Sequence, residues 1–207
     1  MGISNGNDGQ IEQIAIKDVK NDILKAAKSL FATKGFEGTT VRQLCDKAGV
    51  SLALVSYHFG GKDNVFYALF EPLDRNFKNM TYDLTVAEKA LRDFIRSFVI
   101  YRYEEPELIH ILQQELMMRS PRLDKLKNVI LPSWQQLRSI LEAGKLEGTI
   151  QFDSVQFAVN FVMGTLIFSL NDSFLNPSES DQDITSEQAA GLVIRFVFNG
   201  LNPTVIK

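Results

Sequence analysis

The chain has 207 residues, of which 45% are hydrophobic and 23% are charged, a composition typical of a globular protein. Its formal net charge of -3 argues against a protein that coats nucleic acid through a global basic field. The charge is uneven: residues 1–62 carry eight Lys and Arg against six Asp and Glu, or +2, which leaves -5 for the remainder. This bias fits a local contact with nucleic acid near the N-terminus.

Three further features of the sequence bear on the cellular compartment of the protein and on its contact with a membrane. Cys45 is the only cysteine, so an internal disulfide or a cysteine-based zinc site is excluded, and we interpret this residue as a packing residue in a reducing cytoplasm. The N-terminus lacks a basic segment followed by an apolar core, so we expect no signal peptide. The longest apolar stretch, residues 157–170, is shorter than the about 20 residues of a bilayer span. We therefore predict a cytoplasmic protein without membrane contact.

The N-terminal region begins with a polar segment rich in Gly and Asn. We predict that residues 1–16 form a mobile tail. Apolar residues recur at helical spacing from Val19, and this pattern predicts a helix that ends at Lys34. Gly35 can take the positive φ that ends a helix, so the first helix is expected to stop there.

Two short helices are predicted next. Thr40 precedes the first, which closes at Gly49, and Ser51 precedes the second, which stops at Gly60-Gly61. Hydroxyl side chains in these positions accept hydrogen bonds from the free amides of a helix start. Both residues are therefore predicted as N-caps.

The later part of the chain carries longer helical patterns. Ser120 is expected to cap a helix whose first residue is Pro121, and Pro132 is expected to kink or break it. Asp153 and Gln156 resemble a capping box. The polar stretch "NPSESDQD", residues 176–183, reads as a loop. The predicted helices cover approximately residues 62–79, 86–104, 106–118, 121–148, 154–171 and 185–199.

No strand-like alternation persists and no internal repeat is present, so the sequence predicts an all-α fold. Within it, two short helices separated by "AGVS" have the pattern of a helix-turn-helix. Gly49 permits the tight turn, and Val50 is expected to pack between the two helices. In such a pair the second helix lies in the major groove of DNA while the first crosses the backbone.

Residues 23–70, "ILKAAKSLFATKGFEGTTVRQLCDKAGVSLALVSYHFGGKDNVFYALF", resemble the DNA-binding domain of TetR-type transcriptional repressors. The "YHFGGK" run places the chain near family members that share it. The motif covers about a quarter of the chain, and its parts agree in spacing. The matching features are Lys34-Gly35-Phe36, Thr40, Ala48-Gly49-Val50-Ser51, His58-Phe59 and Lys62.

The same motif supplies candidate DNA contacts. Phosphate oxygens accept from hydroxyl, imidazole and cationic donors. The predicted phosphate contacts are Thr40, Arg42, Ser51, Tyr57, His58 and Lys62. Thymine methyl groups and base edges suit small apolar and hydroxyl side chains, and the predicted base contacts are Leu52, Ala53 and Ser56. The family usually has a tyrosine two residues before the histidine, where this chain has Ser56, so that base contact is not carried over.

The resemblance implies a dimeric repressor that binds a palindromic operator and is released by a small molecule. An apolar or aromatic effector is favoured because the second half of the chain is rich in aromatic residues that could line a cavity. The candidate pocket residues are Phe98, Arg102, His110, Gln114, Met118, Trp134 and Phe161. His110 and Glu115 share a helical face, but the chain has only two histidines, so we expect no metal and no other cofactor.

We accordingly predict a DNA-binding domain at residues 17–65 and a ligand-sensing and dimerisation domain at 66–207. Helices 154–171 and 185–199 would pair with their two-fold mates in a four-helix bundle. Their small residues are Ala158, Gly164, Ala189, Ala190 and Gly191. The alternatives are an all-α enzyme or small-molecule carrier, and a dimeric interaction module that does not bind DNA. Salt-dependent, sequence-specific binding to duplex DNA would distinguish the regulator from both.

Overall fold

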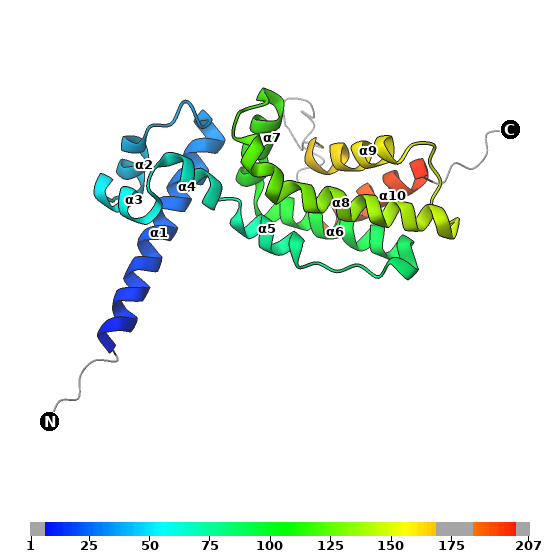
Figure 1. The fold of residues 1–207 in the computed structure, drawn as a ribbon, viewed down its shortest axis with the longest axis horizontal. Helices are drawn as coiled ribbons and strands as arrows, with labels where there is room; N and C mark the ends of the chain where they lie inside the picture. The colour runs from blue at the N-terminus through cyan, green and yellow to red at the C-terminus, as the bar shows by residue number, and fades with distance from the viewer. Residues whose placement is uncertain (1–6, 169–183, 202–207) are drawn as a thin grey trace. The chain divides into compact units, whose positions relative to one another are not determined.

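The computed structural model describes residues 7–168 and 184–201, and within these ranges the chain is helical and contains no strand (Figure 1). The predicted all-α fold is confirmed. The chain forms two compact units. The first contains the residues up to Pro72 together with His110–Leu126, and the second contains Leu73–Ile109 and the residues from Lys127 onward. A segment from the second half of the sequence therefore packs with the N-terminal helices, which the predicted boundary at residues 65 and 66 does not anticipate.

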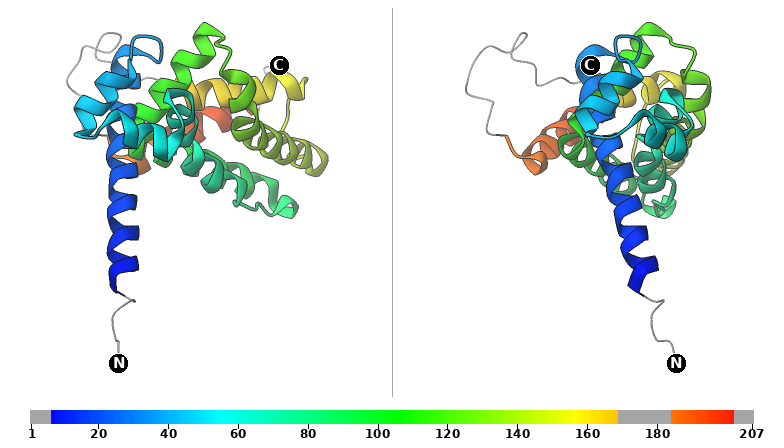
Figure 2. Two further views of the ribbon diagram at one scale, coloured as in Figure 1. Left: turned by 60° about the vertical axis from the view of Figure 1, so that its left-hand side comes forward. Right: turned by 90° about the vertical axis from the view of Figure 1, so that its left-hand side faces the viewer.

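The first unit is built on α1 (Asn7–Lys34), α2 (Val41–Ala48), α3 (Leu52–Phe59) and α4 (Lys62–Ala68). Helix α1 begins at Asn7, so residues 7–16, which were predicted as part of a tail, are helical (Figure 2). No glycine or proline interrupts residues 10–34, so the backbone can remain helical over this whole length.

Aromatic side chains hold the first unit together. Helix α1 packs on α2 and α4, and α2 packs on α3. The rings of Phe31, Phe36 and Phe66 contact one another, with centroids 5.4, 5.8 and 5.3 Å apart. Cys45 is buried in α2, and burial raises the pKa of its thiol, in keeping with a packing role. The fully buried side chains include Ile23, Ala27, Phe31, Leu44, Val55, Val65 and Phe66.

The second unit has α6 at its centre. Helix α6 (Ala87–Glu104) follows a short 3-10 turn and packs on α9 (Val155–Phe168) and α10 (Ser186–Leu201). The Arg92 guanidinium lies 4.2 Å from the Phe198 ring centroid, and Arg96 forms an ion pair with Glu187 at 2.7 Å. These contacts join α6 to α10. Helices α5 (Glu71–Lys78), α7 (Pro106–Met118) and α8 (Leu123–Glu147) each have residues in both units.

The predicted helices and the observed ones differ at two prolines. One helix was expected over 62–79, but α4 ends at Ala68 and α5 begins at Glu71. Pro72 has no N–H to donate to the Ala68 carbonyl, so the helix cannot run through. Pro132, by contrast, lies inside α8 without breaking it. There the carbonyl that loses its partner belongs to Asn128, an exposed residue that water can reach.

Helix starts differ as well. Helix α8 begins at Leu123, and Ser120 accepts from the Arg122 N–H in the turn before it. Ser154 rather than Asp153 caps α9, because its Oγ accepts from the Phe157 N–H at 3.4 Å. The predicted end of this helix near residue 171 and the predicted loop at 176–183 lie outside the described residues.

The described helices include none with the length and apolarity needed to cross a bilayer. In the same part of the chain, no group of three or more His, Cys, Asp or Glu side chains is arranged to hold a metal ion. His110 is exposed on α7, whereas Glu115 is buried, so the two do not form a common site on the surface.

Tyr101 is buried in α6, with its ring centroid 5.5 Å from that of Phe77, and its hydroxyl has no hydrogen-bond partner among the residues that the structure describes. Burial, with Glu105 and Glu104 adding to it, raises the pKa of this phenol above its ordinary 10.0. The unfolded chain releases this proton at a lower pH than the folded protein does. The contribution of Tyr101 to the free energy of unfolding is therefore fully present below about pH 10 and is lost as the pH rises further.

We expect Tyr101→Phe to be neutral or to stabilise the protein by up to about 1 kcal/mol at pH 7, because it removes a buried hydroxyl that has no partner in the described part of the chain. Its advantage over the unmodified protein should grow above about pH 10. Urea unfolding at pH 7 and pH 10.5 would measure both effects. Parallel pH profiles for the two proteins would contradict the expectation.

Candidate DNA-binding site

A capping box fixes the start of α2. The Thr40 Oγ1 accepts from the Gln43 N–H at 3.2 Å, and the Thr40 N–H donates to the Gln43 Oε1 at 2.9 Å. Helix α2 ends at Gly49, whose φ of 68° lies in the left-handed region that favours glycine. The Val50 N–H then donates to the Cys45 carbonyl at 3.1 Å, so the turn into α3 is tightly defined.

Helix α3 exposes one face and buries the other. Ser51 caps it, with its Oγ accepting from the Leu54 N–H at 3.4 Å, and Val55 is fully buried. The exposed side chains are Leu52, Ala53, Ser56 and Tyr57. At about 100° per residue these four span about 140° of the helix circumference. The three predicted base contacts therefore share one continuous exposed surface, and Tyr57 extends it.

Tyr57 stands out on this surface because its side chain is 78% exposed. Its ring packs edge-on against His58 with centroids 5.0 Å apart, and His58 is half-buried. Tyr57 was predicted as a phosphate contact, but its place beside Ala53 and Ser56 also suits contact with a base. The remaining phosphate candidates Thr40, Arg42 and Ser51 are exposed.

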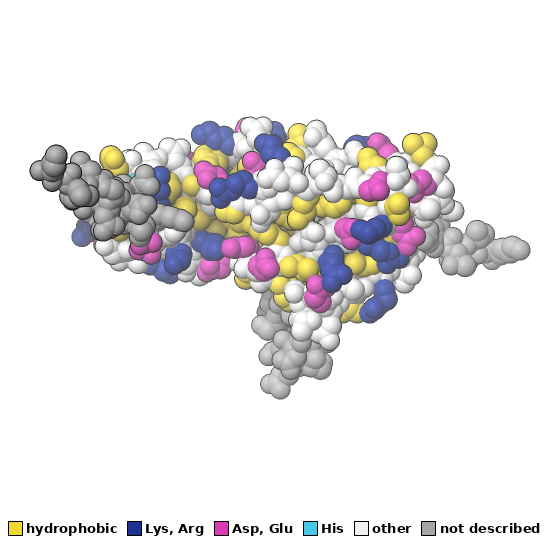
Figure 3. Space-filling model, turned by 90° about the horizontal axis from the view of Figure 1, so that it is seen from below, with side chains coloured by type: hydrophobic (Ala, Val, Ile, Leu, Met, Phe, Trp, Pro, Cys, Tyr) yellow, Lys and Arg dark blue, Asp and Glu magenta, His cyan; other side chains and the backbone are white. Residues whose placement is uncertain are grey.

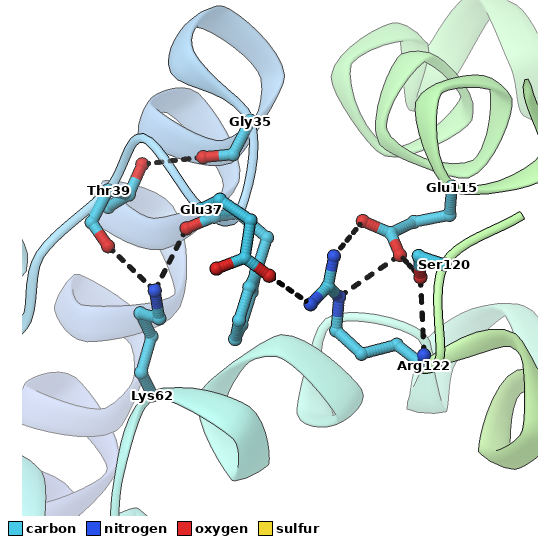
Figure 4. A network of polar contacts seen from close by, with 8 residues as sticks. Gly35, Glu37, Thr39, Lys62, Glu115, Ser120 and Arg122 are labelled. Carbon is cyan, nitrogen blue, oxygen red and sulfur yellow. Dashed lines mark hydrogen bonds and ion pairs between the residues drawn. The ribbon is translucent and has the colours of Figure 1, made fainter. Parts of the chain in front are cut away.

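Lys62 differs from the other phosphate candidates. Its Nζ donates to the Phe36 carbonyl and to the Thr39 carbonyl, both at 2.9 Å, and lies 3.9 Å from the Phe36 ring centroid (Figure 4). Two of its three hydrogens are thus directed at the loop between α1 and α2. Lys62 has a structural role that the sequence did not indicate, and its contact with phosphate stays a prediction.

One face of the molecule carries charged side chains of both signs. Figure 3 shows basic and acidic side chains interspersed on the face in view, in keeping with the small net charge. An interaction with DNA therefore depends on the local arrangement around α2 and α3 rather than on a broad basic surface.

The seven predicted pocket residues are divided between the two units. His110, Gln114 and Met118 belong to the first unit, whereas Phe98, Arg102, Trp134 and Phe161 belong to the second. The spread has a simple cause, because α7 carries its C-terminal half into the first unit. Phe98 is buried, and its ring contacts that of Phe77 in a tilted arrangement. Arg102 donates to the Leu166 carbonyl, and burial lowers the pKa of its guanidinium.

A cleft of about 1140 Å³ lies in the second unit, beside the start of α9 and the end of α10. Of the predicted pocket residues it contains only Phe161. Phe157, Phe161 and Phe196 line it and are largely exposed. The sequence analysis named Phe161 but neither Phe157 on α9 nor Phe196 on α10.

The fold and the exposed face of α3 define a helix-turn-helix DNA-binding protein. The family model described as "Bacterial regulatory proteins, tetR family" matches residues 23–69. The chain is 27% identical over 161 residues to the HTH-type transcriptional repressor NicS of Pseudomonas putida, covering 74% of this chain and 76% of that protein.

Two solved structures share the fold of this chain. The hemolysin II transcriptional regulator HlyIIR has a TM-score of 0.70 and 26% identity, covering 90% of this chain and 98% of that chain. The regulator FadR of Bacillus subtilis, solved in complex with stearoyl-CoA, has a TM-score of 0.64 at 20% identity, covering 87% of this chain and 98% of that chain. Residues 23–69 thus match the DNA-binding domain of the TetR family, and the matched relatives are named transcriptional repressors, in agreement with the prediction of a TetR-type regulator.

Proposed function

We propose that the protein binds a palindromic operator as a homodimer in the cytoplasm and is released from it by a small apolar or aromatic effector. The observation that carries the operator part is the continuous exposed surface of α3 formed by Leu52, Ala53, Ser56 and Tyr57. A two-fold dimer presents two such helices to half-sites roughly 34–36 Å apart, or a multiple of that distance.

The dimer is supported by exposed aromatic side chains on α9 and α10. Phe161 is 72% exposed and Phe196 is 73% exposed, and both line the cleft described above. Exposed apolar patches of this kind mark interaction surfaces, because a monomer gains nothing from exposing them to water. A second copy of the chain would cover them through a four-helix bundle.

The effector is proposed on chemical grounds. The second unit buries Phe77, Phe94, Phe98 and Tyr101, so a cavity opened there would have apolar and aromatic walls. FadR, which shares the fold, was solved with an acyl-CoA. Titration of fatty acids, acyl-CoA esters and aromatic acids against the protein–DNA complex would test this part. If no compound of these classes changes DNA affinity, the effector proposal is wrong.

Two substitutions would separate base reading from phosphate contact. The probe is a duplex enriched by the purified protein from a random pool, called here the selected duplex. Ser56→Ala should relax preference at one base position in each half-site, at a cost of about 1–3 kcal/mol in discrimination. Arg42→Ala should weaken binding to all sequences and lower the salt slope by about one contact.

Fluorescence anisotropy with the selected duplex and with scrambled duplexes would measure both effects. Equal losses for Ser56→Ala on all sequences would remove it from the base-reading set. An unchanged salt slope for Arg42→Ala would remove it from the phosphate set.

A further inference from the structure

Arg122 lies at the centre of a cluster formed by Glu37, Glu115, Ser120 and Arg122, here called the Arg122 cluster (Figure 4). Its Nε and one terminal nitrogen donate to the two carboxylate oxygens of Glu115 at 3.0 and 3.1 Å. The other terminal nitrogen donates to Glu37 at 2.8 Å. The Ser120 hydroxyl also donates to Glu115, so both carboxylate oxygens of this buried residue are occupied.

The cluster joins two segments that are far apart in sequence. Glu115, Ser120 and Arg122 belong to residues 110–126, whereas Glu37 lies in the loop between α1 and α2. Gln114 adds a second attachment, because its Nε2 donates to the Ala32 carbonyl at 3.0 Å in the last turn of α1. Segment 110–126 is therefore held against both the end of α1 and the loop that follows it.

The contacts continue from this loop to the helix-turn-helix. The Arg122 guanidinium lies 3.9 Å from the Phe36 ring centroid, and Lys62 lies at the same distance from that centroid. Lys62 donates to the carbonyls of Phe36 and Thr39, and the Thr39 hydroxyl donates to the Gly35 carbonyl at 2.9 Å. The next residue, Thr40, caps α2. Each contact restrains the loop that sets the start of α2.

We propose that Arg122 is a positioning residue for DNA binding, which fixes the α1–α2 loop to segment 110–126 and so holds α2 and α3 in their binding arrangement. Its side chain is only 11% exposed, and three of its five N–H groups are bound to carboxylates. Arg122 therefore acts through the loop and not by direct contact with a phosphate.

The Arg122 cluster lies where two helices that continue into the second unit end or begin. Helices α7 and α8 both have residues in the second unit and both end or begin at the Arg122 cluster. A shift of either helix would move the partners of Arg122 relative to the loop. This consequence rests on the proposed effector response, but the positioning role itself is measured without any effector.

The test compares Arg122→Gln with Arg119→Gln on the selected duplex. Arg119 is exposed on the same corner between α7 and α8, so both variants lose one positive charge there. Its φ of 47° is positive, but Gln and Arg both carry a Cβ, so the substitution adds no backbone strain. We expect Arg122→Gln to bind about tenfold more weakly with an unchanged salt slope, and Arg119→Gln to stay within about twofold of the unmodified protein.

Glu37→Gln provides a second, independent variant. Glu37 is exposed, so the change should leave folding intact. Removal of a negative charge would strengthen DNA binding if only net charge mattered, whereas loss of the link to Arg122 should weaken binding by about twofold to fivefold. If Arg122→Gln fails to fold, the direction of the Glu37→Gln effect decides the matter.

Three results would overturn the positioning role. They are equal affinities for Arg122→Gln and Arg119→Gln, tighter binding by Glu37→Gln, and a salt slope reduced by about one contact in Arg122→Gln, which would mean direct phosphate contact. The unmodified protein in the same titration tests the proposed function separately. If it does not bind the selected duplex specifically, both proposals fail, whereas normal binding with unaffected variants rejects Arg122 alone.

Discussion

Phe161→Glu is expected to convert the dimer to a monomer and to weaken binding to the selected duplex by about 100-fold or more. Phe161 is exposed in the middle of α9, where a second copy would cover it, and a carboxylate buried in an apolar interface carries a large desolvation cost. A monomer engages one half-site only and loses the gain from simultaneous binding. Light scattering after size-exclusion chromatography gives the oligomeric state, and anisotropy gives the affinity.

Leu131→Glu is the matched control for this change. Leu131 is an exposed apolar residue of α8, outside α9 and α10 and not in the lining of the cleft. It adds the same charge to an exposed position, so any general repulsion from DNA appears in both variants. A Phe161→Glu protein that remains dimeric at micromolar concentration would contradict the proposed dimer surface.

Lys62→Met is expected to lower the free energy of unfolding by about 2 kcal/mol. Methionine keeps the apolar stem of the side chain but removes the ammonium, so the carbonyls of Phe36 and Thr39 lose their donor and the Phe36 ring loses a cation. Denaturant unfolding measures this loss. The salt slope on the selected duplex shows whether Lys62 also contacts a phosphate.

Lys47→Met serves as the control, because Lys47 is an exposed lysine of α2 with a hydrogen bond to the Ser29 Oγ at 2.7 Å. We expect its effect on stability to stay within about 0.5 kcal/mol. If both variants unfold alike, the contacts of Lys62 contribute little, and its place in the motif needs the phosphate role to explain it.

The positions of the helix-turn-helix helices could be predicted from the sequence because local signals define them. Thr40, Gly49, Ser51 and Gly60 cap or end helices where the sequence placed them, and each acts through its own backbone geometry. The exposed positions of Leu52, Ala53 and Ser56 follow from helical periodicity once the start of α3 is fixed. These features depend on residues a few positions apart, which a single sequence contains.

Contacts between residues far apart in the sequence could not be predicted in this way. The sequence around Arg122, residues 119–123, does not indicate that this residue binds Glu37, because the two are separated by 85 residues in the sequence. Lys62 was predicted from the sequence as a phosphate contact, and only the folded loop shows its carbonyl partners. The sequence also did not indicate that α7 contributes to both units, so the predicted pocket residues come from both of them, and their common pocket stays a prediction.

Sequence-specific DNA binding through α3 is tested most directly by selection of random duplex DNA with the purified protein at moderate salt, followed by sequencing of the bound fraction. We expect an enriched palindrome whose half-sites are about one helical turn, or a multiple of it, apart. The protein should be unfolded and refolded before a second round, so that a bound effector is removed. Absence of any enriched sequence in both rounds would contradict sequence-specific binding through α3.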